Sequence, residues 1–201
     1  MNIKKWKECP GFQETKGRLE THLEDKKTRN IFNWVFQIIV TLVFAIVVGI
    51  VMFQSVTIQE SSMEPTLTVG EKLFVNRGIY KVSSPERGDI IVFKTNGSDE
   101  AALHIGRVIG LPGETVQISN GRVLINGEIY EESGNLPEMT NAGLASSSVS
   151  LENGEYFVLG DNRNNSEDSR YADIGNVKKK YIVGKLWFVI SPKDKSGFLK
   201  G

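Results

Sequence analysis

Residues 31–53 form an uncharged, mainly apolar run, IFNWVFQIIVTLVFAIVVGIVMF, and no other feature constrains the fold as strongly. As a helix, the run would span roughly 34 Å at about 1.5 Å per residue, enough to cross a bilayer core of about 30 Å. A buried helix of a soluble protein rarely lacks a polar face for so long, and the apolar part of a cleaved secretory peptide is only about 7–15 residues. The run therefore predicts a retained transmembrane anchor that contacts the lipid bilayer.

The charges on either side of this run predict its orientation. Residues 1–30 contain eight basic and five acidic residues, a net charge of +3, and because the whole chain is neutral the remainder carries −3. Basic residues collect on the cytoplasmic side of a membrane span. The sequence thus predicts a single-pass protein of the cell membrane in three parts. These are a cytoplasmic basic tail (1–30), helical or disordered, a transmembrane anchor (31–53) and an extracytoplasmic domain (54–201).

Composition excludes several classes of function. A formal net charge of zero argues against a nucleic-acid-binding protein. The single cysteine, Cys9, rules out an intrachain disulfide and gives no basis for a cysteine zinc site. Two histidines, His22 and His104, are too few for a multi-histidine metal centre. We therefore expect no metal and no cofactor.

Short β-rich runs separated by turn signals fill the predicted outer domain. Asn120-Gly121 lies between two of them, and this pair tolerates the positive φ angles of a type I′ hairpin turn. No segment after the anchor has a sustained apolar stripe of helical period. The fold class is therefore mainly β with one N-terminal transmembrane helix. The predicted strands are 72–76, 89–93, 104–109, 115–119, 122–125, 128–131, 155–159 and 181–190.

Four segments carry the candidate chemistry: SMEPTL (62–67), GDIIVF (88–93), RVIGLPGE (107–114) and GDNRNNSEDSR (160–170). By composition alone, the last is typical of a charged surface turn held by Asp–Arg pairs. In this order after one anchor, the segments resemble the bacterial type I signal peptidases in their Gram-positive short form. The resemblance runs from the anchor to about Pro192. It implies a signal-peptidase-like outer β domain and a membrane-anchored serine endopeptidase that cleaves signal peptides from exported precursors.

The resemblance also implies roles for single residues. It places the nucleophile of a metal-independent Ser–Lys dyad at Ser62, whose backbone amide would help to stabilise the oxyanion. Met63 is expected near the bilayer surface, and Arg107 matches the arginine that usually follows the catalytic lysine. The residues expected to support the dyad and the fold are Asp161, Arg163, Ser166, Asp168 and Arg170.

The lysine of the dyad has no counterpart in this chain. Family members typically have K-R-V-I-G-L-P-G where the sequence has G-R-V-I-G-L-P-G, starting at Gly106. A serine hydroxyl is a poor nucleophile unless a neighbouring base accepts its proton. In subtilisin, loss of the base alone lowers kcat about 10⁶-fold. The resemblance therefore predicts a catalytically impaired member, unless Gly106 is an introduced change or another group replaces the lysine.

His104 is the best candidate for a substitute base. It lies two residues before Gly106, so on a strand both positions share one face. It is displaced by roughly 6.6 Å along the strand, a distance that normally prevents a hydrogen bond to a fixed serine. A histidine that only packs or faces solvent is the alternative, and strand spacing favours neither Lys72 nor Lys94.

Glu60 is a second departure, because the family usually has a small residue two positions before the nucleophile. A carboxylate there would repel a developing oxyanion and narrow a pocket for small side chains, unless it points to solvent. An introduced Lys→Gly change at position 106 would leave Glu60 unexplained.

Three functions fit these observations. The first, which we favour, is a non-catalytic signal-peptidase-like protein that binds the signal peptides of exported preproteins or assists surface-protein or pilus assembly. Pilins are partners by analogy only. The second is an active type I signal peptidase with an unorthodox base, and the third is a membrane-tethered structural β domain with relic motifs. Cleavage and binding of a labelled precursor would distinguish them.

Overall fold

The first helix of the chain is longer than the predicted anchor. The computed structural model describes residues 10–95, 101–132, 136–192 and 196–199, and of residues 10–25 it describes the backbone alone. The chain divides into two units, Met1–Ile50 and Val51–Gly201. Helix α1 spans Pro10–Met52, so the tail is helical from Pro10 onward. Phe53, which we had placed at the end of the apolar run, instead begins the first strand.

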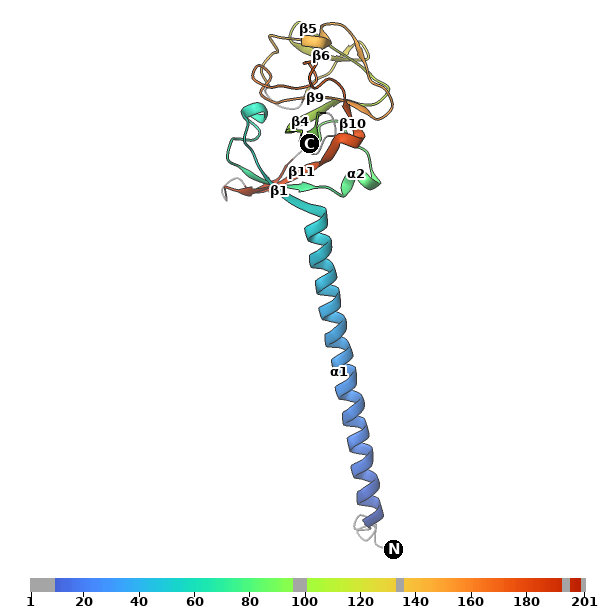
Figure 1. The fold of residues 1–201 in the computed structure, drawn as a ribbon. Coiled ribbons are helices and arrows are strands. Elements are labelled where there is room, and N and C mark those ends of the chain that lie inside the picture. The colour runs from blue at the N-terminus through green and yellow to red at the C-terminus, as the bar shows by residue number, and fades with distance from the viewer. Residues whose placement is uncertain (1–9, 96–100, 133–135, 193–195, 200–201) are drawn as a thin grey trace. The chain divides into compact units, whose positions relative to one another are not determined.

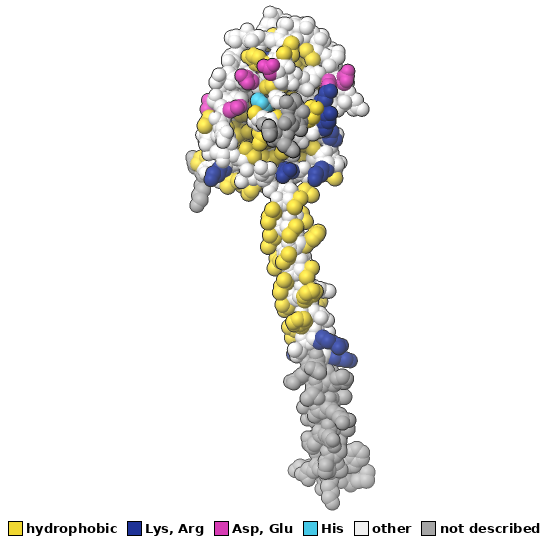
Figure 2. All heavy atoms as spheres, in the orientation of Figure 1, with side chains coloured by type: hydrophobic (Ala, Val, Ile, Leu, Met, Phe, Trp, Pro, Cys, Tyr) yellow, Lys and Arg dark blue, Asp and Glu magenta, His cyan; other side chains and the backbone are white. Residues whose placement is uncertain are grey.

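Within the described residues, Lys26–Met52 is the one helical segment long and apolar enough to cross a membrane. Its 27 residues would span about 40 Å at about 1.5 Å per residue. Phe32, Trp34 and Phe44 are all more than half exposed, and Figure 2 shows hydrophobic side chains along the helix. The length and the exposed apolar surface of this helix are consistent with membrane anchoring.

The second unit contains two antiparallel sheets (Figure 1). In the described chain, the larger has eight strands, in the order β1-β2-β11-β3-β4-β9-β10 with β12 paired to β11. These strands are β1 (Phe53–Thr57), β2 (Lys72–Asn76), β3 (Ile90–Lys94), β4 (Leu103–Gly110), β9 (Glu155–Leu159), β10 (Val177–Lys178), β11 (Ile182–Ser191) and β12 (Gly197–Phe198).

The smaller sheet has four described strands in the order β7-β6-β5-β8. They are β5 (Thr115–Ser119), β6 (Arg122–Ile125), β7 (Glu128–Ile129) and β8 (Val149–Ser150). The remaining described elements are short helices: α2 (Ile79–Val82) and the 3₁₀ turns η2 (Ser61–Met63), η3 (Gly143–Ser146) and η4 (Lys179–Tyr181).

The predicted fold class, mainly β with one long N-terminal helix, is confirmed. Strands β2, β5, β6 and β9 have the predicted bounds, and the other predicted strands differ at their ends by one or two residues. The hairpin between β5 and β6 forms at Asn120-Gly121, whose φ angles are +51° and +75°. Strand β1 was not predicted, because its first residue continues the apolar run of the anchor.

Strand β3 is buried on both faces, so its alternate side chains enter two different cores. Ile90 and Val92 pack in one core with Met63. Ile91 and Phe93 pack in another with Val158. Strand β4 pairs with β3, so its side chains alternate between the same two cores. Ile105 pairs with Val92 and faces the core of Met63, whereas Gly106 pairs with Ile91 and faces the core of Val158.

A buried carboxylate joins two strands of the larger sheet to helix α2. Asp89, immediately before β3, is 4% exposed and forms an ion pair with Lys185 of β11. It also accepts hydrogen bonds from the Tyr80 hydroxyl of α2 at 2.7 Å and from the Glu86 amide at 3.0 Å. Burial, followed by the hydrogen bond to Asp89, raises the pKa of Tyr80. The Asp89 carboxylate therefore holds α2 and β11 to the start of β3.

We predict that Asp89→Ala destabilises the domain by about 3 kcal/mol, because a half-buried Lys185 and a buried tyrosine hydroxyl lose their partner. Thermal unfolding of the full chain in detergent, followed by near-ultraviolet circular dichroism, would measure a Tm lower by about 6–12 °C. The exposed Asp173 serves as the control, and Asp173→Ala should leave the Tm unchanged. An equal Tm for Asp89→Ala and the parent would contradict this role of Asp89.

Candidate functional site

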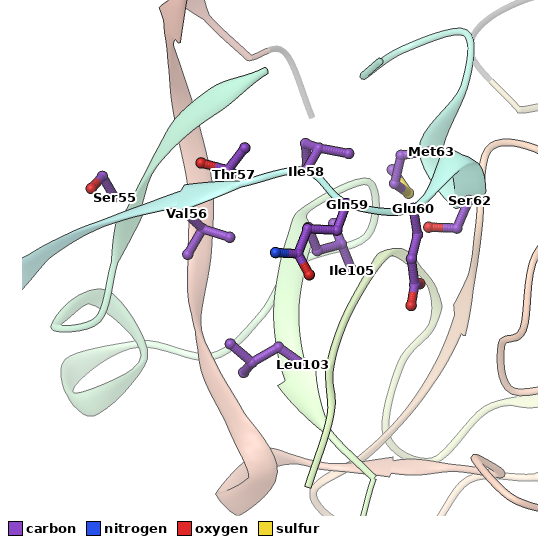
Figure 3. Close-up of a pocket in the computed structure, with 10 residues that line it drawn as sticks. All are labelled: Ser55, Val56, Thr57, Ile58, Gln59, Glu60, Ser62, Met63, Leu103 and Ile105. Carbon is purple, nitrogen blue, oxygen red and sulfur yellow. The ribbon is translucent and has the colours of Figure 1, made fainter. Parts of the chain in front are cut away.

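A pocket of about 340 Å³ lies between the β1 segment and the start of β4 (Figure 3). One wall consists of β1 and the extended residues that continue it to Ser62, and the other wall carries Leu103 and Ile105 of β4. Apolar side chains of both walls line it, and two of them, Ile58 and Met63, are buried. Met63, which we expected near the bilayer surface, is 0% exposed within the protein core.

Both walls of the pocket have a backbone edge without a strand partner. Among the described strands, β1 pairs only with β2. The ladder between β4 and β9 runs from Arg107 to Gly110, so β9 does not cover the first residues of β4. Unpaired N–H and C=O groups at a strand edge can hydrogen-bond an extended peptide. The pocket is thus suited to an added strand.

Ser62 is held by the segment that follows β9. The Asn162 amide donates a hydrogen bond to the Ser62 carbonyl oxygen at 3.0 Å, and the Asn162 side chain donates to the Ser61 carbonyl oxygen at 3.0 Å. A Cβ atom on Gly160 would lie 2.6 Å from the Ser62 carbonyl oxygen. Gly160 therefore has to lack a side chain for this close approach, which fixes the backbone of the predicted nucleophile.

The hydroxyl of Ser62 is available at the wall of the pocket. Figure 3 shows it on the same side of the segment as the Glu60 carboxylate, facing the part of the pocket that β4 lines. Within the described part of the chain, this hydroxyl forms no hydrogen bond. Neither Lys72 nor Lys94 is among the described residues that line the pocket. Among the described residues, the Ser62 hydroxyl therefore has no hydrogen-bond acceptor for its proton.

Gly106 lies on the face of β4 that meets the core around Val158. It pairs with Ile91 of β3, and a Cβ atom on Gly106 would lie 2.5 Å from Val158 Cγ1. Arg107 pairs with Leu159 in the antiparallel ladder between β4 and β9. Continuing this register by one residue places Gly160 opposite Gly106, so the two glycines are neighbours on the same face. The Ser62 carbonyl oxygen and Ser166 lie over Gly160. A Cβ atom at position 106 would overlap Val158 Cγ1 and would also lie 3.2 Å from the Leu159 carbonyl oxygen.

His104 shares this face, as expected from the spacing. It pairs with Phe93 of β3, and the two rings stack with centroids 5.7 Å apart. The side chain is partly buried. In the described structure the imidazole forms no hydrogen bond to Ser62, and the stacking on Phe93 accounts for its position.

Arg107 and Asp161 form a buried ion pair that connects β4 to the segment after β9. Arg107 Nε and Nη2 donate to the two oxygens of Asp161 at 2.9 and 2.7 Å, and Arg107 Nη1 donates to the Gly88 carbonyl oxygen at 2.9 Å. Thr66 Oγ1 also donates to Asp161, at 2.5 Å. Burial alone would lower the pKa of Arg107, but the hydrogen bonds and the charge of Asp161 outweigh it and raise this pKa. Through Thr66, the pair positions the segment after Ser62.

A second buried cluster surrounds Asp168. It accepts hydrogen bonds from Ser166 Oγ at 2.7 Å, from the Gly160 amide at 3.1 Å and from Arg170 Nε at 2.8 Å. Arg163 is 1% exposed, forms an ion pair with Glu132 at 2.5 Å and donates to the Gly160 carbonyl oxygen at 3.1 Å. These residues fix the loop that holds Ser62. Their burial is inconsistent with the alternative of an exposed surface turn.

Sequence reasoning did not single out several contributors to the site, among them Gln59, Ile105 and Val158. Gln59 and Ile105 line the pocket, and Val158 fills the space beside Gly106. A role for Gln59 beside the pocket could have been predicted from the sequence, since it directly precedes Glu60, which the sequence analysis had placed near the nucleophile. The contact between Val158 and position 106 depends on the pairing of β4 with β9, which no local pattern reveals.

Comparisons with known proteins identify the family of this chain. Residues 31–191 match a family model described as "Signal peptidase, peptidase S26". The chain is 36% identical to signal peptidase I of Bacillus licheniformis over 173 residues, which cover 83% of this chain and 91% of the relative. It is 34% identical to signal peptidase I P of Bacillus subtilis subsp. natto over 179 residues, which cover 86% and 95%. A crystal structure of a signal peptidase I from Enterococcus faecalis V583 is similar at 34% identity and a TM-score of 0.43, covering 52% of this chain and 98% of that one.

We predict that Gly106→Ala destabilises the domain by about 1–3 kcal/mol, because its Cβ atom would overlap Val158 Cγ1. Val158→Ala alone should cost about 2 kcal/mol through lost burial. The double variant should lose about 1 kcal/mol less than the sum, since the alanine at 158 leaves room for the new methyl group. Denaturant unfolding of the full chain in detergent would measure these values.

Gly197→Ala is the matched control, because a Cβ atom there would meet open space. It should change the free energy of unfolding by less than about 0.5 kcal/mol. Additive losses at positions 106 and 158 would contradict the close contact between them.

Proposed function

Because the chain belongs to the signal peptidase family, peptidase S26, we propose that it binds the signal peptides of exported precursors at the pocket beside Ser62. Signal peptides are the substrates that membership of this family implies. In this proposal, residues 31–53 anchor the protein in the cell membrane, the basic tail (1–30) is cytoplasmic, and residues 54–201 form the extracytoplasmic domain. The charge asymmetry around the apolar run supports this orientation.

An extended precursor segment would bind in the pocket as an added strand. The unpaired backbone edges of β1 and of the start of β4 would supply main-chain hydrogen bonds, and alternate side chains would enter the pocket. Anchoring the pocket near a bilayer raises its effective concentration beside membrane-inserted signal segments. None of these contributions needs a lysine at position 106.

We propose further that the protein is catalytically impaired. One observation carries this proposal: among the described residues, the Ser62 hydroxyl has no hydrogen-bond acceptor. Position 106, where the family has its lysine, is a glycine without a side chain. Without a base, the proton of the hydroxyl has no acceptor as the oxygen attacks a carbonyl carbon. The nearby Glu60 carboxylate would also repel the negative charge that develops on the carbonyl oxygen.

A member with an intact scaffold and impaired chemistry fits an assembly role. The ion pair of Arg107 with Asp161 and the hydrogen bonds of Asn162 keep the Ser62 segment in place independently of catalysis. Such a protein could hold exported precursors during surface-protein or pilus assembly. Pilins are the partner class we propose by analogy.

The alternative function is an active type I signal peptidase with an unorthodox base. His104 favours it, because this residue lies on the same face of β4 as Gly106. The imidazole would have to leave its stacked position on Phe93 to accept the proton of Ser62. Either function requires the same bound precursor, so cleavage is the measurement that separates them.

We predict that the full chain in lipid nanodiscs binds a labelled signal-peptide precursor but does not cleave it. Gly106→Lys combined with Val158→Ala should introduce cleavage at least about 100-fold above the parent, since it supplies a base and removes the methyl groups in its path. Gel analysis of the labelled product measures cleavage, and fluorescence anisotropy measures binding.

Adding Ser62→Ala to the double variant should abolish this cleavage, and Val158→Ala alone should not produce it. Cleavage by the parent that is lost in both Ser62→Ala and His104→Ala would instead establish the alternative function. No binding of the precursor above that to empty nanodiscs would contradict both functions.

A further inference from the structure

We propose that Glu60 makes the pocket selective for an extended peptide with a lysine or arginine side chain, a preference that rests on the proposed binding of precursors. Glu60 lies two residues before Ser62, in the extended stretch that forms one wall of the pocket. Figure 3 shows its carboxylate and the Gln59 amide both projecting from this stretch toward the side where Leu103 and Ile105 lie. A carboxylate and an amide therefore project into a pocket whose other lining side chains are apolar or carry a hydroxyl group.

Glu60 is the only charged side chain among the described residues that line the pocket. Its carboxylate forms no ion pair and no side-chain hydrogen bond in the described part of the chain. In this respect it differs from Asp89, Asp161 and Asp168, each of which binds a lysine or an arginine. The carboxylate is thus left without an internal cation.

The two polar groups lie beside apolar surface that a bound peptide would cover. Val56, Leu103 and Ile105 provide this surface, and water next to it would be displaced. A neutral side chain bound there would take water from the Glu60 carboxylate without replacing its hydrogen bonds, which opposes binding. An ammonium or guanidinium group would replace them and add an attraction between opposite charges.

The lengths of the side chains fit this arrangement. Lysine and arginine place their alkyl stems along apolar surface while the charged end reaches a polar group. The stem would contact Ile105 and Leu103, the charged end would meet Glu60, and the Gln59 amide oxygen would accept a further hydrogen bond. An acidic side chain in the same place would face Glu60 with like charge.

The test uses the full chain in nanodiscs of zwitterionic lipid, so that basic peptides do not bind the bilayer through its charge. The probes are short labelled peptides of small uncharged residues that differ at one position, which is lysine, alanine or glutamate. Moving this position along the peptide identifies the residue that meets Glu60. Fluorescence anisotropy gives each Kd.

We expect the best lysine peptide to bind about tenfold more tightly than the alanine peptide, and the glutamate peptide to bind most weakly. Glu60→Gln should bring the Kd of the lysine peptide to that of the alanine peptide, and Glu60→Lys should reverse the order. Raising the salt concentration to about 0.5 M should reduce the preference. Glu128→Gln, the same chemical change at an exposed position of β7, should leave all three Kd values unchanged.

The outcomes separate this inference from the function on which it rests. Equal Kd values for the three peptides at every position would overturn the role of Glu60 and leave the precursor-binding function intact. A lysine preference that persists in Glu60→Gln would overturn it as well. If no peptide binds above empty nanodiscs, both proposals fail.

Discussion

The buried ion pair between Arg107 and Asp161 is the interaction on which the rest of the site depends. It joins β4 to the segment after β9, and Thr66 donates to the same carboxylate from the chain that follows Ser62. Asp161 is 0% exposed, so removing either partner would leave a buried charge uncompensated, at a cost of about 3–5 kcal/mol. This cost applies whether or not the site catalyses a reaction. The scaffold around Ser62 is therefore maintained by folding stability alone.

The chemistry of the site is separable from this scaffold because position 106 contributes only its backbone. Gly106 pairs with Ile91 in the sheet, and a ladder needs no side chain. Val158 fills the adjacent space, which keeps the core packed without a lysine stem. A glycine at position 106 is thus compatible with the fold and with the pocket.

Local signals in the sequence were sufficient for most of the sheet and insufficient for the site. The strand Lys72–Asn76 alternates buried and partly exposed residues, and Asn120-Gly121 can adopt positive φ angles, so both could be predicted without a partner strand. The contact of Val158 with position 106 could not, because it depends on how two strands far apart in the chain align. Similarly, the role of Met63 in the core follows from packing that its neighbours in sequence do not reveal.

Glu60 and Gly106 both oppose catalysis, but neither of them opposes the binding of a peptide. In a peptidase, a carboxylate beside the nucleophile opposes the oxyanion of the transition state, so catalysis would select against Glu60. A protein that only binds its peptide forms no oxyanion, and this constraint does not apply. The same carboxylate can then contribute to the ground-state affinity for a cationic side chain. On the proposal that the protein binds its peptide without cleaving it, the glycine at position 106 and the carboxylate at position 60 are compatible with the same function.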